Sequence, residues 1–323
     1  MPRILEVTMR PASYPRGLVI IGGMQLVVSF AAPLTEAGRQ ALAELRLLRL
    51  DAWLAQAEVA ARDDADEATL SPPHERALAH ALGWQARVDG TQPWAARLAR
   101  ADGIEVGTQP WGLLTPVHWR VGSDGVHLSD PATLDLDEAS SRALLDALRP
   151  WFESEGFALA WGAPLRWYAS HPSLEALAVA SLDRVIGRNV ERWLPAQPEA
   201  RLVRRLQNEA QMVLHAHPLN AAREAAAAVP VNSFWLSGCG AAPAESAGEA
   251  PRVDERLRAS ALAQDWATWR EAWAALDREG FADVTRLTLC GERGAATLMP
   301  ARRSLWQRIS APRLVSRALL ESL

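Results

Sequence analysis

The stretch Gln25-Leu-Val-Val-Ser-Phe30 decides the fold class of this 323-residue chain. A short apolar run containing β-branched residues is typical of a buried β-strand. The Ala-, Leu- and Arg-rich segment that follows, from Pro33 to about Arg62, predicts helix with a break near Asp51. A buried strand that leads directly into helix indicates an α/β protein.

Further strands and helices alternate along the rest of the chain. The acidic run 63–67 predicts a solvated loop, and the alternation from Trp111 to Leu128 around Asp124-Gly125 predicts a β-hairpin. Other helices are predicted at 72–82, 137–156, 174–193, 198–216, 262–276 and from Pro312, and strands at 157–161, 165–168, 231–236 and 284–290. This order favours an α/β fold with a mixed or mainly parallel sheet flanked by helices.

The composition changes at two places and suggests three segments. Residues 1–23 differ from the rest and are interpreted as a tail or as a mis-annotated start before Met24. Residues 24–240 are predicted to form the α/β domain, and 241–251, rich in Ala, Gly, Pro and Glu, a linker or surface loop. Residues 252–323 carry a Trp-rich helix and a strand, which we expect to pack on the same domain.

The charges of the chain exclude several classes of function. The formal net charge is −4, and all 34 basic residues are arginines, so no Schiff-base or phosphate-loop lysine exists and arginine must bind any anionic ligand. The sequence contains no basic stripe of the kind that predicts nucleic-acid binding. No apolar run is long enough to span a membrane. Without an export signal the chain is expected to be cytoplasmic, with Cys239 and Cys290 as reduced thiols.

The segment 217–240 holds the densest group of candidate binding residues. Asn220, Arg223 and Asn232 lie beside a predicted strand that ends in Gly238 and Gly240. Glycines there let backbone amides approach an anion or another chain closely, and an arginine can grip a carboxylate or phosphate. The segment is predicted to bind a small anionic ligand, and the alternative is a structural role for the whole segment. Cys239 is expected to be either an activated thiol or, as the alternative, a buried and inert one. Trp235, in the predicted strand of this segment, is a further candidate.

Three more residues are candidates in other segments. Glu209 leans into the apolar face of the predicted helix 198–216, where it would be partly buried. Burial would raise its pKa, whereas pairing with an arginine such as Arg223 would lower it, and a purely structural ion pair is the alternative. His118 and Trp119 lie on the predicted hairpin opposite His127, where a His/Asp metal site is conceivable but matches no known spacing. We therefore predict no metal ligands, no cofactor and no catalytic residue.

Four motifs resemble the RpfE-type regulatory proteins of proteobacteria over roughly Met24 to Cys290. They are Thr115-Pro-Val-His-Trp119, Ser181-Leu-Asp-Arg-Val-Ile-Gly-Arg-Asn189, Leu206-Gln-Asn-Glu-Ala-Gln-Met212 and Asn232-Ser-Phe-Trp-Leu-Ser-Gly238. The resemblance implies a regulatory protein that binds a partner or a ligand.

The segment 220–240 is also distantly similar to archaeal-type cofactor-independent phosphoglycerate mutases, which implies an alkaline-phosphatase-like fold. Enzymes of that kind hold two divalent metals through an Asp after the first strand, a Ser or Thr nucleophile and further Asp and His ligands. Here the first strand runs into Ser29-Phe-Ala-Ala-Pro33 without that Asp, and no Asp-His pair follows residue 240.

Three hypotheses follow from these residues. In the first, the chain is a regulatory protein without turnover, with an unidentified protein partner or a small anionic ligand. In the second, it is a mutase-like enzyme or relic that uses Arg223 and Glu209 on a small phosphorylated acid. In the third, the residues of 217–240 only tie a loop to the sheet.

Overall fold

The computed structural model describes residues 23–243, 250–301 and 314–323, which form two compact units. Unit 1 comprises the chain up to Glu67, Pro73–Leu82 and the chain from Glu249 onward, whereas unit 2 comprises Ala68–Pro72 and Gly83–Gly248. Residues 24–67 thus group with the C-terminal segment, a different division from the expected single domain 24–240. The predicted tail lies outside the described residues except for Gly23, and so does the centre of the predicted linker.

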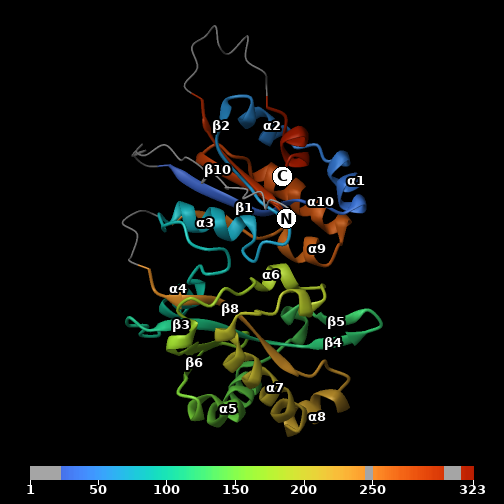
Figure 1. Cartoon of the computed structure of the whole chain (residues 1–323). Helices are drawn as coiled ribbons and strands as arrows, with labels where there is room; N and C mark the ends of the chain where they lie inside the picture. The colour runs from blue at the N-terminus through green and yellow to red at the C-terminus, as the bar shows by residue number, and fades with distance from the viewer. Residues whose placement is uncertain (1–22, 244–249, 302–313) are drawn as a thin grey trace, which may run out of the picture. The chain divides into compact units, whose positions relative to one another are not determined.

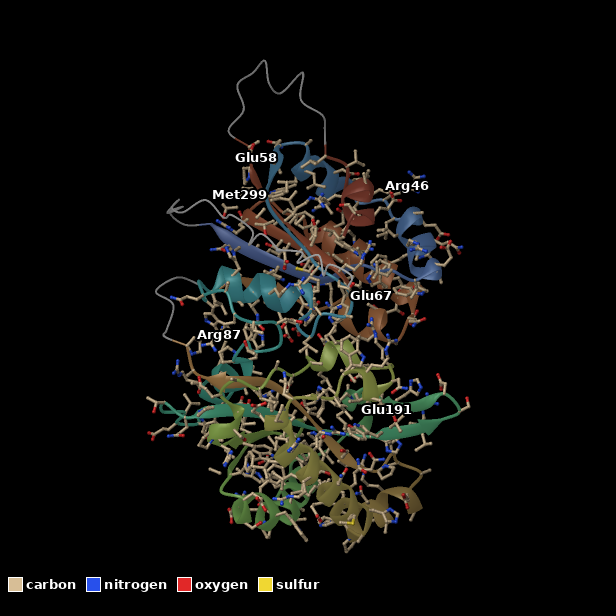
Figure 2. All side chains as sticks on the ribbon, viewed as in Figure 1. Arg46, Glu58, Glu67, Arg87, Glu191 and Met299 are labelled. Atoms are coloured by element: carbon tan, nitrogen blue, oxygen red, sulfur yellow. The ribbon has the colours of Figure 1, made fainter. Side chains whose placement is uncertain are left out.

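Unit 1 is built on a five-stranded mixed sheet in the order β2-β11-β10-β1-β9 (Figure 1). Its strands are β1 (Met24–Ala32), β2 (Ala57–Asp64), β9 (Arg252–Asp254), β10 (Val284–Gly291) and β11 (Gly294–Pro300). β1 pairs in parallel with both β9 and β10, while β11 runs antiparallel to β10 and β2. The side chains of Figure 2 include Glu58 and Met299, which are register partners in the β2–β11 pair. The predicted α/β class with a mixed sheet flanked by helices is confirmed.

One face of this sheet carries the main core of unit 1. The apolar residues of β1 and β10 pack there with α1 (Glu36–Glu44), α2 (Leu48–Leu54), α9 (Arg258–Leu262), α10 (Trp266–Glu279) and α12 (Ser316–Glu321). The Trp-rich helix predicted at 262–276 is present as α10, which begins at Trp266, and its Trp269 and Trp273 are fully buried in this core. On the opposite face, the described residues form a small apolar cluster, and α3 (Pro73–Ala81) covers part of that face.

Unit 2 contains a four-stranded antiparallel sheet in the order β6-β7-β3-β8, which the sequence did not predict as a separate sheet. Its strands are β3 (Pro110–Val117), β6 (Ala158–Ala163), β7 (Arg166–Ser170) and β8 (Ser233–Ala241). The predicted hairpin around Asp124-Gly125 is formed by β4 (Trp119–Gly122) and β5 (Gly125–Leu128). The first half of the predicted hairpin segment belongs to β3 instead.

Helices cover both faces of the unit 2 sheet. α5 (Glu138–Ser154) and α7 (Arg201–His215) pack in the larger core, and the Asp137 side chain caps α5. α4 (Trp94–Ala101) packs with a second cluster that includes Trp111 and Tyr168. The remaining helical elements are α6 (Leu182–Val185), α8 (Pro218–Ala225) and short 3-10 turns at Pro131–Leu134, Pro172–Leu174, Val190–Arg192 and Pro198–Ala200.

Two predicted elements are wrong. Residues 57–64 were expected to be helix and loop, but they form β2 because seven of its residues pair with β11. Tertiary pairing here overrides the helix propensity of an Ala- and Arg-rich segment.

The predicted helix 174–193 is replaced by turns and extended chain. Val179 donates its backbone N–H to the carbonyl of Gly90, and Ser181 donates to the carbonyl of Leu70, so this stretch bonds to other loops instead of to itself. Gly187, at φ 75°, then ends the short helix α6. In the part of the chain that the structure describes, no helix has the length and hydrophobicity needed to cross a membrane.

Candidate functional site

Asn220 lies in α8 and uses its whole side-chain amide inside the protein. Its Nδ2 donates to the carbonyls of Leu214 and Val231 at 2.7 Å each, and its Oδ1 accepts from the Val231 N–H at 2.9 Å. The residue is only 3% exposed. Asn220 therefore holds the loop before β8 and offers no polar atom to an external ligand.

Arg223 is also directed at backbone carbonyls. Its Nε donates to Val229 at 2.9 Å, and its Nη2 donates to Leu134. The expected pairing with Glu209 is not formed, and Glu209, half-buried on α7, makes no side-chain hydrogen bond to any residue the structure describes. These two predicted site residues are not brought together.

Asn232 joins the start of β8 to the hairpin. Its Oδ1 accepts from the Trp119 N–H at 2.7 Å, and its Nδ2 donates to the Trp119 carbonyl at 2.9 Å. The ring of His118 is hydrogen-bonded through Nδ1 to the carbonyl of Pro230 at 2.9 Å. Both contacts bind the hairpin to the β8 loop, as the third hypothesis expects.

His127 does not assemble a metal site with His118. Its Nε2 lies 3.0 Å from the Asp124 carboxylate on the same hairpin. Among the residues with described positions, no group of three or more His, Cys, Asp or Glu side chains could hold a metal ion.

The two glycines of β8 accommodate another part of the same chain. Gly238 has φ 63°, and a Cβ built on it would lie 2.9 Å from the backbone nitrogen of Ala95. The glycine thus lets the start of α4 in the same chain approach β8, a use that differs from the expected approach of an anion or of another chain. Trp235 is buried and donates from Nε1 to the carbonyl of Ala180 at 2.9 Å, while Cys239 is a buried free thiol.

The carboxyl end of β1 in unit 1 is held by internal contacts. Phe30 has φ 55°, a conformation that costs a bulky residue about 1–3 kcal/mol. The indole N–H groups of Trp269 and Trp273 donate to the carbonyls of Phe30 and Ala31 at 3.0 and 3.2 Å. Because these bonds hold the last residues of β1, the shape of the strand end follows from packing against α10.

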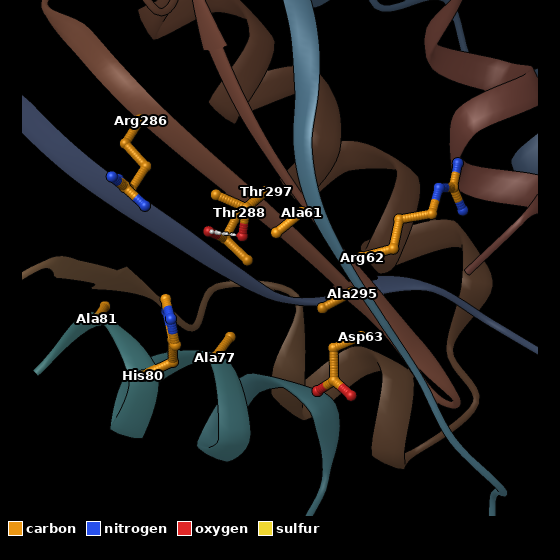
Figure 3. Close-up of a pocket in the computed structure, with 10 residues that line it drawn as sticks. All are labelled: Ala61, Arg62, Asp63, Ala77, His80, Ala81, Arg286, Thr288, Ala295 and Thr297. Carbon is orange, nitrogen blue, oxygen red and sulfur yellow. Dashed lines mark hydrogen bonds between the residues drawn. The ribbon is translucent and has the colours of Figure 1, made fainter. Parts of the chain in front are cut away.

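A pocket lies on the face of the unit 1 sheet that α3 partly covers. β10 contributes Arg286 and Thr288, β11 contributes Ala295 and Thr297, and β2 contributes Ala61, Arg62 and Asp63; α3 closes the other side with Ala77, His80 and Ala81 (Figure 3). Small alanine side chains leave the space open, and the polar groups around it come from three strands and one helix.

The floor of this pocket is a pair of hydroxyl groups. Thr288 and Thr297 are register partners on β10 and β11, and their Oγ1 atoms lie 3.0 Å apart in a hydrogen bond. In such a pair only one hydroxyl hydrogen is used, so the second remains available to a bound acceptor. Figure 3 shows both hydroxyls between Arg286 on one side and Asp63 on the other.

The charged side chains around the pocket differ in whether they have a hydrogen-bond partner. Asp63 accepts from Arg76 Nε at 2.7 Å, and Arg62 donates to the Ser322 hydroxyl at 3.1 Å. Half-buried Arg286, by contrast, makes no hydrogen bond or ion pair with any described residue. Its guanidinium has neither a hydrogen-bond partner nor a counter-ion among the described residues, whereas Arg62 has at least the Ser322 hydroxyl.

Arg286, His80, Thr288 and Thr297 were not among the residues predicted from the sequence. The strand 284–290 was predicted correctly, and its alternation places Arg286 and Thr288 on one face and Leu287 and Leu289 on the other. The polar face of this strand was the feature of the sequence that could have indicated the pocket. The residues of β2 gave no such indication, because their segment was predicted to be helix and loop.

No family model matches this sequence, and no curated protein matches it significantly. Several solved structures resemble this chain, among them the following two. One is a cofactor-independent phosphoglycerate mutase from Thermoplasma acidophilum, with 14% identity, a TM-score of 0.37 and coverage of 93% of this chain and 98% of that chain. The other is the PH0037 protein from Pyrococcus horikoshii, with 11% identity, a TM-score of 0.42 and coverage of 87% and 88%.

The distant likeness to phosphoglycerate mutases that the sequence suggested is thus found again among solved structures. Both TM-scores are below 0.5, so the likeness carries no argument about activity. None of these comparisons shows membership of the RpfE-type family.

Proposed function

We propose that this chain is a ligand-binding protein whose pocket between α3 and the mixed sheet of unit 1 holds a small anion at Arg286. The observation that carries the proposal is the absence of a counter-ion for Arg286 within the described structure. A half-buried guanidinium has lost part of its hydration, so an anion that enters with matching oxygens is favoured.

The surroundings of Arg286 favour the binding of an anion over that of a cation. The hydroxyls of Thr288 and Thr297 provide a hydrogen-bond donor nearby, and His80 lies on the opposite wall. The negative charge of Asp63 is already engaged by Arg76. Since the chain has no lysine, arginine is the permanently charged cationic side chain that is available for an anion here.

We further propose that the residues of 217–240 have a structural role. Asn220, Arg223 and Asn232 direct their polar groups at backbone carbonyls and amides of neighbouring segments. On this view a regulatory role of the RpfE type would depend on ligand binding in unit 1. A cytoplasmic location and an unidentified protein partner remain part of this hypothesis.

The mutase-like alternative makes a different prediction. It requires metal-dependent turnover of a small phosphorylated acid that is lost in Arg223→Ala. Our proposal instead requires anion binding that survives in any Arg223 variant that still folds, because Arg223 lies in unit 2 and contacts Val229 and Leu134.

Thermal unfolding of the purified full chain tests the proposal. Midpoints are compared with inorganic phosphate, 3-phosphoglycerate, manganese, zinc or sodium chloride of equal ionic strength. Because a ligand at a hundred times its Kd adds about 2.7 kcal/mol, saturating phosphate should raise the midpoint by a few degrees. No rise with any anion would overturn the proposal, and a rise with metal alone would favour the mutase-like alternative.

A further inference from the structure

His80 faces the pocket from the last turn of α3. Figure 3 shows its imidazole and the Arg286 guanidinium directed toward one another, from the helix and from the sheet. An anion bound to Arg286 would therefore lie close to an imidazole ring, the side chain whose charge changes most readily near neutral pH.

Charged groups on two strands lie near His80. Arg286 on β10 and Asp63 on β2 act on it electrostatically, while β1 and β11, which also pack against α3, contain no charged residue. Arg62 on β2 lines the same pocket but donates to Ser322. The titratable or charged neighbours on α3 itself are His74, Glu75 and Arg76.

In the unliganded protein these surroundings favour the neutral ring. Partial burial lowers the pKa of His80 below 6.5, the charge of Arg286 lowers it further, and Asp63 raises it. The residue as a whole is exposed, so solvent screens part of each effect. At neutral pH the ring is therefore mostly uncharged.

We propose that His80 is a second, proton-dependent binding group of this pocket, which takes up one proton from solvent when an anion binds at Arg286. The proposal rests on the proposed anion binding. The protonated ring donates an N–H to the anion, so the bound anion contacts one cation from the sheet and one from the helix. Doubly charged anions gain most from this arrangement.

The direction of the pH dependence follows from linkage. A bound anion offsets the repulsion from Arg286 and attracts the imidazolium, so it raises the pKa of His80 above that in the free protein. The affinity must then increase as the pH falls through the pKa of the complex, and it levels off below the pKa of the free protein.

Titration calorimetry with sulfate tests this coupling, because sulfate itself does not titrate between pH 5 and pH 8. The full chain, His80→Gln and a control, His215→Gln, are compared at pH 5.5 and 8. His215 is an exposed histidine in unit 2. We expect the affinity of the unmodified protein and of the control to rise about threefold to tenfold at the lower pH, and that of His80→Gln to stay unchanged.

Two results would overturn the proposal, and they are distinguishable. Sulfate binding of equal affinity at both pH values would remove the role of His80 and leave the anion site intact. Absence of sulfate binding at either pH would remove the anion site as well. Proton NMR of the His80 ring provides a second readout, since its titration midpoint should move to higher pH when sulfate is added.

Discussion

Asn232 clamps the backbone of Trp119 with both ends of its amide, accepting from the Trp119 N–H at 2.7 Å and donating to the Trp119 carbonyl at 2.9 Å. This arrangement reproduces the pair of bonds that a neighbouring strand would make. It ties the first residue of β4 to the loop that leads into β8. Both polar atoms of the amide are used inside the protein, so loss of this side chain should lower the free energy of unfolding.

Asn232→Ala is therefore expected to lower the free energy of unfolding by about 1–3 kcal/mol, because it leaves a half-buried N–H and carbonyl without partners. Denaturation in urea measures the loss. Asn208→Ala, an exposed asparagine on α7, is the matched control and should change stability little. Equal stability of the two variants would contradict the structural role of Asn232.

Asp102 should make unit 2 sensitive to acid. It accepts from Arg166 Nε and Nη2 at 3.0 and 2.8 Å and from the Tyr168 hydroxyl at 2.7 Å. These bonds, above all those from Arg166, lower the pKa of Asp102 below 3.8. Its contribution to stability is complete above the pKa of the unfolded chain and is lost as pH falls through the lower pKa of the folded protein.

Unfolding curves at a series of pH values from about 5 to about 2 measure this effect. Asp102→Asn should be less stable than the unmodified protein at the upper end and should lose less stability as the pH falls. Asp146→Asn, which removes an exposed carboxylate of unit 2, is the control. If the free energy of unfolding changed with pH in Asp102→Asn as steeply as in the unmodified protein, this linkage would be ruled out.

Cys239 and Cys290 should be unreactive in the folded protein. Both thiols are fully buried, and burial raises the pKa of each well above that of an ordinary cysteine. Since the thiolate is the reactive form, a thiol reagent at pH 8 should modify neither cysteine until the protein unfolds. Modification at the same rate with and without denaturant would show that the thiols are accessible.

Much of the fold could be predicted from local patterns in the sequence. The apolar run 25–30, the Asp137 cap and the tryptophan spacing of α10 each specify an element through neighbours close in the chain. β2 could not be predicted in this way. Its partner β11 lies more than 230 residues away, and no property of Ala57–Asp64 alone indicates that pairing.

The candidate site was harder to predict than the fold. The Asn and Arg residues of 217–240 were predicted to bind a ligand because such side chains bind anions. The same side chains also bind backbone groups. Arg223 shows the difference, since its partners are the carbonyls of Val229 and Leu134. Arg286 gave a weaker signal, and only its position in the folded sheet sets it apart.

The central claim is that Arg286 binds an anion, and titration calorimetry with inorganic phosphate at pH 7.5 tests it most directly. Arg286→Gln is compared with the unmodified protein and with Arg317→Gln, which removes an exposed arginine from α12 of the same unit. We predict that phosphate binds the unmodified protein and the Arg317 variant alike, and at least about tenfold more weakly to Arg286→Gln. Equal phosphate affinity of all three proteins, or none in any, would contradict the claim.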